Sequence, residues 1–438
     1  MRTERTNTLV RTVGRRGRHG LVASSVALLL VVWLASGALA QPGGLDATFS
    51  GNGWVATDLG SGLDFAYDVA LSETDGTIVA AGQGPGSGGR FAIIRYQSNG
   101  TLDASFGGDG TVLTDFTLGY DAAFAVALQA DGKIVAAGTA SGGGGRVALA
   151  RYETDGTLDD TFGGDGKVLT NLTSGDDFAY AIVIQPADQT IVVAGGAGGG
   201  AGRFAVVRYG TNGVLDASFS GDGWILTDFT NAYDYVDAIA IQADGKIVAA
   251  GATNYYGSTP KFALARYSTN GALDGTSSGD GKLTTAFPGG YAWAFGVAIQ
   301  DDDKIVAVGQ AGANTALTRY HPNGTLDSTF SGDGRVTANI AAGADYVDEV
   351  MIQPDGKLVT VGTSSWGSQD TRFALARFNP GGSLDSTFSG DGRVLTNLSP
   401  GTDWGIGGLL QPSDGKIVVA GRTSGGGGRF VVARYLVS

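Results

Sequence analysis

The side chains that could carry acid–base or metal chemistry are few in kind. Beyond the first forty residues the chain has no cysteine and a single histidine, His321, which lies in a His-Pro-Asn-Gly turn. A Ser-His-Asp triad could form only through His321, and sites built from several histidines or from thiolates are excluded. Comparable turns carry Glu153 and Ser268 at this position. His321 is therefore interpreted as a surface turn residue.

Carboxylates are the remaining candidates for catalysis. The chain has 42 acidic residues, of which only four are glutamates. Hydrolysis of a glycoside requires two carboxyl groups at a set separation, one of them with a raised pKa. Three of the glutamates, Glu73, Glu153 and Glu349, lie beyond residue 40. Glu73 and Glu153 lie in predicted turns, where water would solvate them. Glu349 interrupts the apolar pattern of residues 346–351 and is the most unusual of the three, although a charge at an exposed sheet edge explains it simply.

Oxygen ligands for calcium are also abundant, as in the segment from Thr154 to Asp160. No segment has the spacing of an EF-hand loop or of the Gly-Gly-x-Gly-x-Asp nonapeptide. Aspartates in turns of this kind commonly bond their own backbone. We therefore predict no metal site and no cofactor, with calcium as the one alternative.

The elements that must position these groups are copies of one unit. A segment that begins with Leu-Asp recurs seven times, at intervals of 53 to 58 residues. Such a period indicates a single supersecondary unit that is copied and stacked. The copies begin at Leu45, Leu102, Leu158, Leu215, Leu273, Leu326 and Leu384.

Each copy contains four short apolar runs with the length and composition of strands. In the second copy they span residues 110–116, 124–129, 133–138 and 147–152, and an Asp-Gly turn joins the middle pair. No run has the length or spacing of an amphipathic helix. We therefore predict an all-β, seven-bladed β-propeller of four-stranded antiparallel blades, with an open β-solenoid as the alternative. If the first run forms the outer edge of the preceding blade, residues 53–59 complete the last blade and close the ring.

The repeat also resembles a known family. The signature LDxxFxGDGxVxTD, followed by DGKIVAAG and FxLARYxxDG, is similar to the delta-60 repeat of bacteria and covers residues 45–435. The resemblance implies a seven-bladed propeller of uncharacterised function in exported proteins, with no catalytic residues to transfer. The fifth copy departs most from the signature, with Ser277 in place of Phe and Ala292 in place of Asp.

Aromatic residues near the strand ends are candidates for binding. An Asp-aromatic step such as Asp403-Trp404 precedes the second strand of most copies. Packing between blades and a turn bond explain it, and an acidic, aromatic ring at one mouth of the channel is the functional alternative. Two loops between the third and fourth strands carry Tyr255, Tyr256 and Trp366, where sibling loops have glycine and serine. Because loops on a rigid scaffold concentrate binding residues, the candidate ligand-binding residues are Tyr255, Tyr256, Trp366 and Trp404.

An arginine ends the fourth strand of every copy, on a face that it shares with apolar residues. A buried guanidinium is costly unless it is paired, and each copy offers an aspartate in the next Leu-Asp step. We therefore predict seven structural ion pairs, each with the following phenylalanine packed beneath. The arginines are Arg95, Arg151, Arg208, Arg266, Arg319, Arg377 and Arg434. Their partners, in the same order, are Asp103, Asp159, Asp216, Asp274, Asp327, Asp385 and, across the ring closure, Asp46.

Residues 1–40 differ from the repeats. Several arginines precede an apolar run over residues 21–34, and a small-x-small pattern ends at Ala40. This order is typical of a secretory signal peptide; a retained membrane anchor and, through Arg15, twin-arginine export are the alternatives. We expect residues 41–438 to form a single propeller domain without a membrane span, exported to the periplasm or outside the cell.

Removal of residues 1–40 changes the net charge from −13 to −18, because six arginines and one glutamate leave the chain. Nucleic acid and anionic membranes are poor partners for such a surface. We predict an exported scaffold that binds an unknown protein or glycan through loops at one end, without catalysis. A carboxylate-dependent carbohydrate hydrolase or lyase is one alternative, and a structural or adhesive cell-surface protein is another. Two buried acids that converge in the channel would favour the enzyme, and an aromatic loop patch would favour binding.

Overall fold

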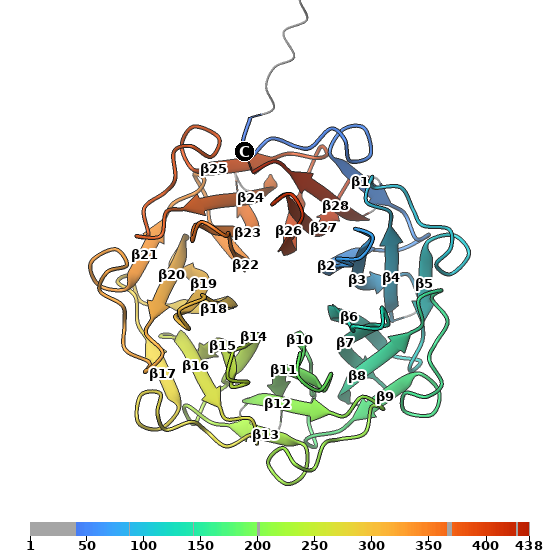
Figure 1. Cartoon of the computed structure of the whole chain (residues 1–438), viewed down its shortest axis with the longest axis horizontal. Helices are drawn as coiled ribbons and strands as arrows, with labels where there is room; N and C mark the ends of the chain where they lie inside the picture. The colour runs from blue at the N-terminus through green and yellow to red at the C-terminus, as the bar shows by residue number, and fades with distance from the viewer. Residues whose placement is uncertain are drawn as a thin grey trace, which may run out of the picture. The chain divides into compact units, whose positions relative to one another are not determined.

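The computed structural model describes residues 41–86, 88–142, 144–198, 202–365, 370–425 and 428–437. These residues form 28 strands in seven four-stranded antiparallel sheets, which stand side by side around a central axis (Figure 1). The predicted seven-bladed, all-β propeller is therefore confirmed. Over the same ranges the structure contains no helix, and so none able to cross a membrane.

Each blade runs from an inner strand at the axis to an outer strand at the circumference. We number the blades 1 to 7 by their inner strands, which are β2 (Phe65–Leu71), β6 (Tyr120–Leu128), β10 (Ala181–Ile184), β14 (Tyr235–Ile241), β18 (Ala292–Ile299), β22 (Asp345–Ile352) and β26 (Asp403–Leu410). The second strands are β3 (Ile78–Gly84), β7 (Ile134–Ser141), β11 (Ile191–Ala197), β15 (Ile247–Thr253), β19 (Ile305–Ala311), β23 (Leu358–Ser365) and β27 (Ile417–Thr423). The third strands are β4 (Arg90–Tyr96), β8 (Gly145–Tyr152), β12 (Arg203–Tyr209), β16 (Lys261–Tyr267), β20 (Asn314–Tyr320), β24 (Thr371–Phe378) and β28 (Arg429–Tyr435). The outer strands are β5 (Thr111–Thr114), β9 (Lys167–Thr170), β13 (Trp224–Thr227), β17 (Lys282–Thr285), β21 (Arg335–Ala338), β25 (Arg393–Thr396) and β1 (Trp54–Thr57).

Blade 7 contains both ends of the repeat region. β1 pairs antiparallel with β28, with Trp54 opposite Ala433 and Thr57 opposite Phe430. The order of strands in this sheet is β1-β28-β27-β26. The prediction that the N-terminal run completes the last blade is confirmed. The ring is therefore closed by main-chain hydrogen bonds between segments that are far apart in the sequence.

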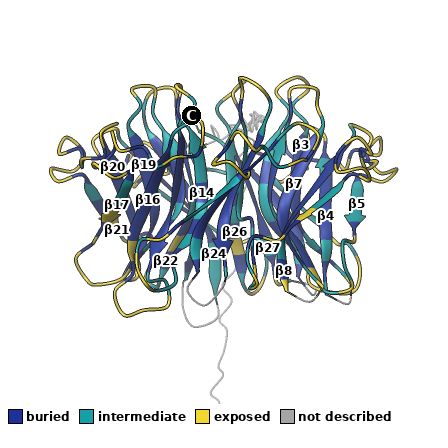
Figure 2. Ribbon diagram, turned by 90° about the horizontal axis from the view of Figure 1, so that it is seen from below, coloured by how far each residue is buried: buried dark blue, intermediate teal, exposed yellow. Residues whose placement is uncertain are grey.

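The apolar cores lie between neighbouring blades. Seven clusters of buried side chains occur in the described part of the chain, and each combines residues of two adjacent blades. The second strands supply both of their faces to these cores, since every residue of β11 and β15 is buried. Figure 2 shows the buried strands between exposed loops on the two faces of the ring. Burial of apolar surface, at about 25 cal/mol per Å², therefore holds each blade to the next.

A β-bulge interrupts most inner strands and directs a side chain to the axis. In β2 the pairing with β3 shifts between Ala66 and Asp68, which leaves Tyr67 outside the ladder. Gly82 stands opposite this bulge, where a Cβ atom would lie only 1.7 Å from the carbonyl oxygen of Phe65. The same shift occurs in β6, β14, β18, β22 and β26. Because a bulge re-aims side chains, it brings one residue of each such blade to the channel.

Candidate functional site

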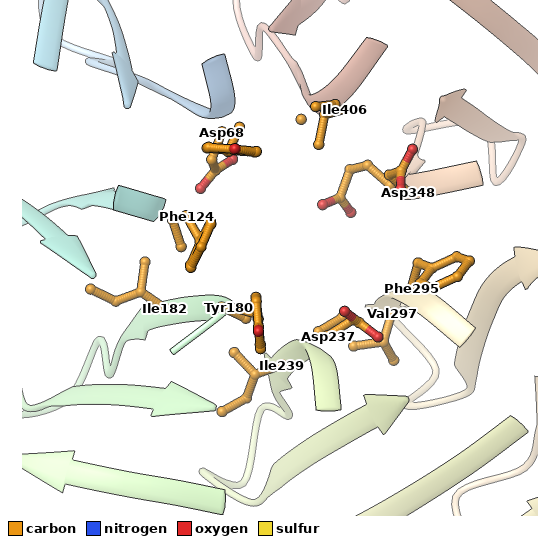
Figure 3. Close-up of a pocket in the computed structure, with 16 residues that line it drawn as sticks. Asp68, Phe124, Tyr180, Ile182, Asp237, Ile239, Phe295, Val297, Asp348 and Ile406 are labelled. Carbon is orange, nitrogen blue, oxygen red and sulfur yellow. The ribbon is translucent and has the colours of Figure 1, made fainter. Parts of the chain in front are cut away.

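A cavity of about 230 Å³ occupies the channel at the level of the bulges. All seven blades contribute to its lining. Figure 3 shows the side chains of Phe124, Asp237, Asp348 and Ile406 around this central space. The lining is uneven, with aromatic rings over blades 1 to 3 and most of the carboxyl groups over blades 4 to 6.

Aromatic rings form a continuous row along one side of the cavity. The ring centroid of Phe124 lies 5.1 Å from that of Tyr67 and 5.1 Å from that of Tyr180. Tyr180 in turn contacts Phe178 at 5.6 Å and Tyr235 at 4.8 Å. These spacings are typical of stacked and edge-to-face ring pairs. The row therefore presents apolar faces to the channel and leads outward from it.

Four carboxyl groups line the cavity, those of Asp68, Asp237, Asp348 and Glu349. Two of them accept hydrogen bonds from backbone N–H groups. Val69 and Val126 donate to the two oxygens of Asp68, at 2.7 and 2.8 Å. The bond from Val126 joins blade 2 to blade 1. Val350 donates to one oxygen of Glu349 at 2.9 Å. Asp68 is thus satisfied on both oxygens, whereas Glu349 keeps one oxygen for another partner.

The other two carboxyl groups, those of Asp237 and Asp348, lack such partners. Oδ2 of Asp237 is buried without a hydrogen bond, and none of the described donors bonds to Asp348. Burial raises the pKa of Asp348 to about 7, that of Glu349 to about 8 and that of Asp68 to about 6. Burial also raises the pKa of Asp237 well above its usual range, with a further increase from the charge of Asp348 and a partial offset from Tyr235. Protonated and ionised carboxyl groups therefore coexist in the cavity near neutral pH.

The position of Glu349 corrects one interpretation. A charge at an exposed sheet edge was the simple explanation from sequence, but β22 is an inner strand and Glu349 lines the cavity. The other two acids differ from it, since Glu153 pairs with Lys133 at 2.7 Å and Glu73 lies in the turn after β2. Acidic side chains therefore converge in the channel. Besides Glu349 they are Asp68, Asp237 and Asp348, none of which was selected from the sequence.

Basic and metal-binding groups are missing from this site as far as the structure describes the chain. No lysine, arginine or histidine lines the cavity, and no three acidic or histidine side chains of the described ranges could hold a metal ion together. His321 lies in its exposed turn, 3.6 Å from Asp327. The one histidine of residues 41–438 therefore lies outside the cavity.

A second hollow, of about 450 Å³, opens at the mouth of the channel between blades 3 and 4. Tyr233, Tyr235, Tyr255 and Tyr256 line it, and Tyr180 lines both hollows. Ring centroids lie 5.0 Å apart in the pairs Tyr233–Tyr256, Tyr235–Tyr255 and Tyr255–Tyr256. The aromatic row of the cavity therefore continues into this hollow, which we call the aromatic rim.

The structure brings together only some of the predicted binding residues. Tyr255 and Tyr256 both belong to the aromatic rim. Trp404 lies at the start of β26 in blade 7, where the guanidinium of Arg422 covers its ring at 4.7 Å and that of Phe65 at 4.4 Å. Trp366 lies outside the described residues.

The aspartates of the Asp-aromatic steps are buried at the starts of the inner strands or just before them, where they accept hydrogen bonds from the preceding turn. Leu59 N–H donates to Asp64 at 2.8 Å, and Leu398 N–H donates to Asp403 at 2.6 Å. The aromatic residues that follow stay partly exposed at the mouth, as Trp404 does. The mouth is therefore aromatic, and these six aspartates do not make it acidic. They are Asp64, Asp177, Asp234, Asp345 and Asp403, together with Asp121, which Ala122 follows in place of an aromatic residue.

The seven arginines of the third strands contact the aspartates assigned to them, with Nε–Oδ2 distances of 2.6 to 2.9 Å. In six of these pairs the guanidinium also lies 4.6 to 4.9 Å from the centroid of a phenylalanine ring. The exception is Arg266, because Ser277 replaces the phenylalanine there. None of the seven arginines lines the channel cavity. We call each arrangement an arginine clamp.

Sequence reasoning missed the residues that line the cavity, although a signal was present. In the six blades with a bulge, the bulge residue is the third residue after the aspartate of the Asp-aromatic step, or after Ala292, which replaces that aspartate in β18. Tyr180 occupies the equivalent position in blade 3. In chain order this position holds Tyr67, Phe124, Tyr180, Asp237, Phe295, Asp348 and Ile406. Its side chain thus changes from copy to copy within a regular repeat, which is typical of a position with a function beyond packing.

The repeats match a family model described as a domain of unknown function (DUF5122) beta-propeller. The matched residues are 73–106, 129–162, 187–219, 242–276, 300–330, 353–388 and 413–437. The chain belongs to this family. Each DUF5122 match begins in the turn between the first two strands of a blade, and six of the seven end in the loop that carries the arginine clamp. No curated protein matches this chain.

Solved structures share the fold of this DUF5122 propeller at low identity. Virginiamycin B lyase from Staphylococcus aureus is 11% identical, with 88% of this chain and 99% of that chain covered and a TM-score of 0.51. A streptogramin B lyase is 12% identical, with 87% and 97% covered and a TM-score of 0.51. At such identities the likeness shows the fold alone.

Proposed function

We propose that this propeller is a binding protein that takes a small ligand into the cavity of its channel through the aromatic rim. The observation that carries the proposal is the combination of an aromatic row and unpartnered carboxyl groups in one cavity. Figure 3 shows Phe124 and Asp348 on opposite sides of this space. Ligand sites are typically concave and largely apolar, with a few placed polar groups. The cavity is also larger than the ~150 Å³ that accommodates benzene in a protein core.

The site is rigid before a ligand arrives. Apart from Tyr180, which directly precedes β10, its rings and carboxyl groups stand on inner strands, which are hydrogen-bonded to their second strands on one side and packed against the neighbouring blades. The bond from Val126 to Asp68 fixes two adjacent inner strands directly. Because little side-chain freedom would be lost on binding, such a site favours affinity over adaptability.

The binding proposal is tested by filling the cavity. Three bulge positions already carry the large rings of Tyr67, Phe124 and Phe295, and Tyr180 occupies the equivalent position of blade 3, so the fold should accept Ile406→Trp. We expect calorimetry with glucose, glucosamine, cadaverine and pentanediol to show binding of at least one compound to residues 41–438. Ile406→Trp should abolish that binding without lowering the melting temperature, whereas Val214→Trp, at an exposed turn, should leave it unchanged. Absence of binding by all four compounds, or binding that survives Ile406→Trp, would contradict the proposal.

Carboxylate catalysis is the second candidate function, and the adjacent acids of β22 favour it. The pKa values of Asp348 and Glu349, about 7 and 8, suit a general acid at neutral pH. A carbohydrate hydrolase would release nitrophenol from nitrophenyl glycosides, and a lyase would form unsaturated products from uronate polysaccharides. Activity lost in both Asp348→Asn and Glu349→Gln would support the enzyme, and inactivity of the wild-type chain on both substrate classes would remove it. A structural or adhesive surface protein is the better interpretation if the channel neither binds nor reacts.

We further propose that the chain is exported as residues 41–438 and that its copies are delta-60 repeats. The basic and apolar pattern of residues 1–40 and the repeat signature support these statements. Mass analysis of the protein recovered outside the cytoplasm should find Gln41 as the first residue. Retention of residues 1–40 in the exported protein would show that no signal peptide is removed.

A further inference from the structure

The charges of the cavity are unbalanced. Among the residues that the structure describes, its lining includes four carboxyl groups and no basic side chain. At the mouth, the guanidinium of Arg422 already contacts the rings of Phe65 and Trp404. Ionised carboxylates in a poorly solvated site are costly without an opposite charge. A ligand that supplies positive charge would therefore gain more from this cavity than a neutral one.

The carboxyl oxygens that lack partners need hydrogen-bond donors. Oδ2 of Asp237 is buried and accepts no bond, and Val350 occupies only one oxygen of Glu349. An unmade hydrogen bond at a buried acceptor is costly. A ligand with N–H groups would satisfy these oxygens, whereas a quaternary ammonium ion would not.

The arrangement of the acids selects an extended organic cation over a metal ion. Asp68 belongs to blade 1, Asp237 to blade 4, and Asp348 with Glu349 to blade 6. In the described chain no three of them are close enough to share one metal ion. Charges distributed around a channel instead match a ligand that carries two separated amino groups on an apolar stem.

The aromatic row suits the same ligand. A cation near the face of a tyrosine or phenylalanine is attracted by the ring quadrupole. The protein already uses this contact at the mouth, where Arg422 lies 4.4 Å from the ring centroid of Phe65. Tyr67, Phe124 and Tyr180 line the cavity, and none of the described residues adds a cationic side chain to that lining.

We propose that the channel cavity binds an organic diammonium ion, with its amino groups on the carboxyl groups of Asp237, Asp348 and Glu349 and its apolar stem along the aromatic row. This inference rests on the proposed function and names its ligand class. The formal net charge of −13 would favour the approach of cations.

Ligand uptake in this arrangement displaces protons. The ionisable groups around the cavity are Tyr67 and Asp68 of β2, Tyr120 of β6, Tyr180 ahead of β10, Tyr235 and Asp237 of β14, Asp348 and Glu349 of β22, and Arg422 of β27. Burial raises the pKa of each of these tyrosines, so only carboxyl groups titrate between pH 5 and pH 9. A diamine is fully charged over this range, because its amino groups resemble that of lysine, with a pKa of about 10.4. Its affinity should therefore rise with pH as the carboxyl groups ionise.

The experiment compares cadaverine with pentanediol, which has the same length and shape but no charge. Calorimetry on residues 41–438 at pH 6 and at pH 8.5 measures both compounds. We expect cadaverine to bind at least about tenfold more tightly than pentanediol, and its affinity to rise on the order of tenfold between the two pH values. Asp348→Asn and Asp237→Asn should each lower the affinity for cadaverine by about tenfold or more. The control is Asp391→Asn, which removes an exposed carboxylate outside the cavity and should have no effect.

The outcomes separate this inference from the proposed function. Equal affinities of pentanediol and cadaverine, both lost in Ile406→Trp, would overturn the diammonium ligand and leave a channel that binds neutral molecules. If Asp391→Asn weakens cadaverine binding as much as Asp348→Asn does, cadaverine associates only with the surface. That result would also overturn the diammonium ligand. If neither compound binds but glucose does, the channel remains a binding site of a different class. If nothing binds, both statements are wrong.

Discussion

Arg208 of β12 donates through Nε to Oδ2 of Asp216 at 2.8 Å, and this pair fastens one blade to the next. Its Nη1 donates to the carbonyl oxygen of Thr269, in the turn after β16 of blade 4, at 2.5 Å. Its Nη2 donates to Oγ of Ser218 at 2.9 Å, and the ring of Phe219 lies beneath the guanidinium at 4.8 Å. Because each arginine clamp reaches the following blade in this way, the seven clamps form a ring of their own.

Arg208→Ala should lower the free energy of unfolding by about 3 kcal/mol, because it leaves the carboxylate of Asp216 and the carbonyl of Thr269 without their donor. We expect the lower end of the 3–5 kcal/mol range for broken buried pairs, since the side chain of Asp216 is 22% exposed. Denaturant unfolding measures the change. Arg203→Ala on the same strand is the matched control: its pair with Asp228 is exposed and 3.6 Å long, so it should cost under about 1 kcal/mol. Equal effects of the two substitutions would contradict the clamp.

The arginine clamp of blade 4 lacks its phenylalanine, and a substitution can restore that ring. Ser277 occupies the phenylalanine position, and its buried hydroxyl has no hydrogen-bond partner in the structure. Leu283 fills space where the sibling copies mostly have valine. The double substitution Ser277→Phe with Leu283→Val should raise the unfolding free energy by about 1 kcal/mol, from removal of an unsatisfied group and a new ring contact with Arg266. Ser277→Phe alone should stabilise less, because Leu283 would crowd the ring. A double variant less stable than wild type would show that the blade has adapted to serine.

Stability should fall as the pH rises from 5 to 8.5. The folded-state pKa values of Asp68, Asp348 and Glu349 are raised to about 6, 7 and 8, against about 4 in an unfolded chain. A raised carboxyl pKa contributes stability that is present below the unfolded value and lost as the pH rises through the folded value. Melting temperatures across this range measure the effect. Asp348→Asn and Glu349→Gln should flatten the curve, and a wild-type curve that rises toward pH 8.5 would contradict the burial of these groups.

The loss of stability at acid pH should come from the arginine clamps. The pKa values of Asp46, Asp327 and Asp385 are lowered to about 2, where hydrogen bonds from threonine and the charge of the clamp arginine overcome the effect of burial. A lowered carboxyl pKa contributes stability above about pH 4 that is lost as the pH falls toward 2. Melting temperatures between pH 4 and pH 2 should therefore drop. Asp327→Asn should reduce the size of this drop, and an unchanged slope in that variant would show that other groups control acid unfolding.

Removal of residues 41–59 should open the ring. It takes away β1, which completes the sheet of blade 7, and Asp46, the clamp partner of Arg434 at 2.8 Å. Hydrogen exchange should then become fast along β28, whose outer edge is exposed, while β12 on the far side of the ring stays protected. Slow exchange along β28 in the truncated chain would mean that β1 contributes little to closure.

The repeat made the fold predictable from sequence. Strand-length apolar runs and Asp-Gly turns recur with the copies, and the unmatched first run of residues 53–59 indicated how the ring closes. The arginine clamps could be anticipated for a similar reason, since a charge on an otherwise apolar strand face requires a partner. Both inferences depended only on patterns that local sequence carries.

The channel could not be predicted in the same way, because β-bulges break the alternation of side chains along the inner strands. A strict period of two does not predict that Asp237 and Asp348 leave the ladder and turn to the axis. Nor does sequence alone show that carboxyl groups more than a hundred residues apart, such as Asp237 and Glu349, share one cavity. The loop residues Tyr255 and Tyr256 were found by their departure from the repeat, and the same test applied to the bulge position would have found the cavity.

The central claim, that the channel cavity binds a diammonium ion, is tested most directly by a crystal structure of residues 41–438 with cadaverine. We predict density for the diamine inside the cavity, with its stem beside Tyr67, Phe124 and Tyr180 and its amino groups within hydrogen-bond distance of Asp237 and Asp348. An empty cavity, with cadaverine found only on the exposed acidic turns of the surface, would contradict the account.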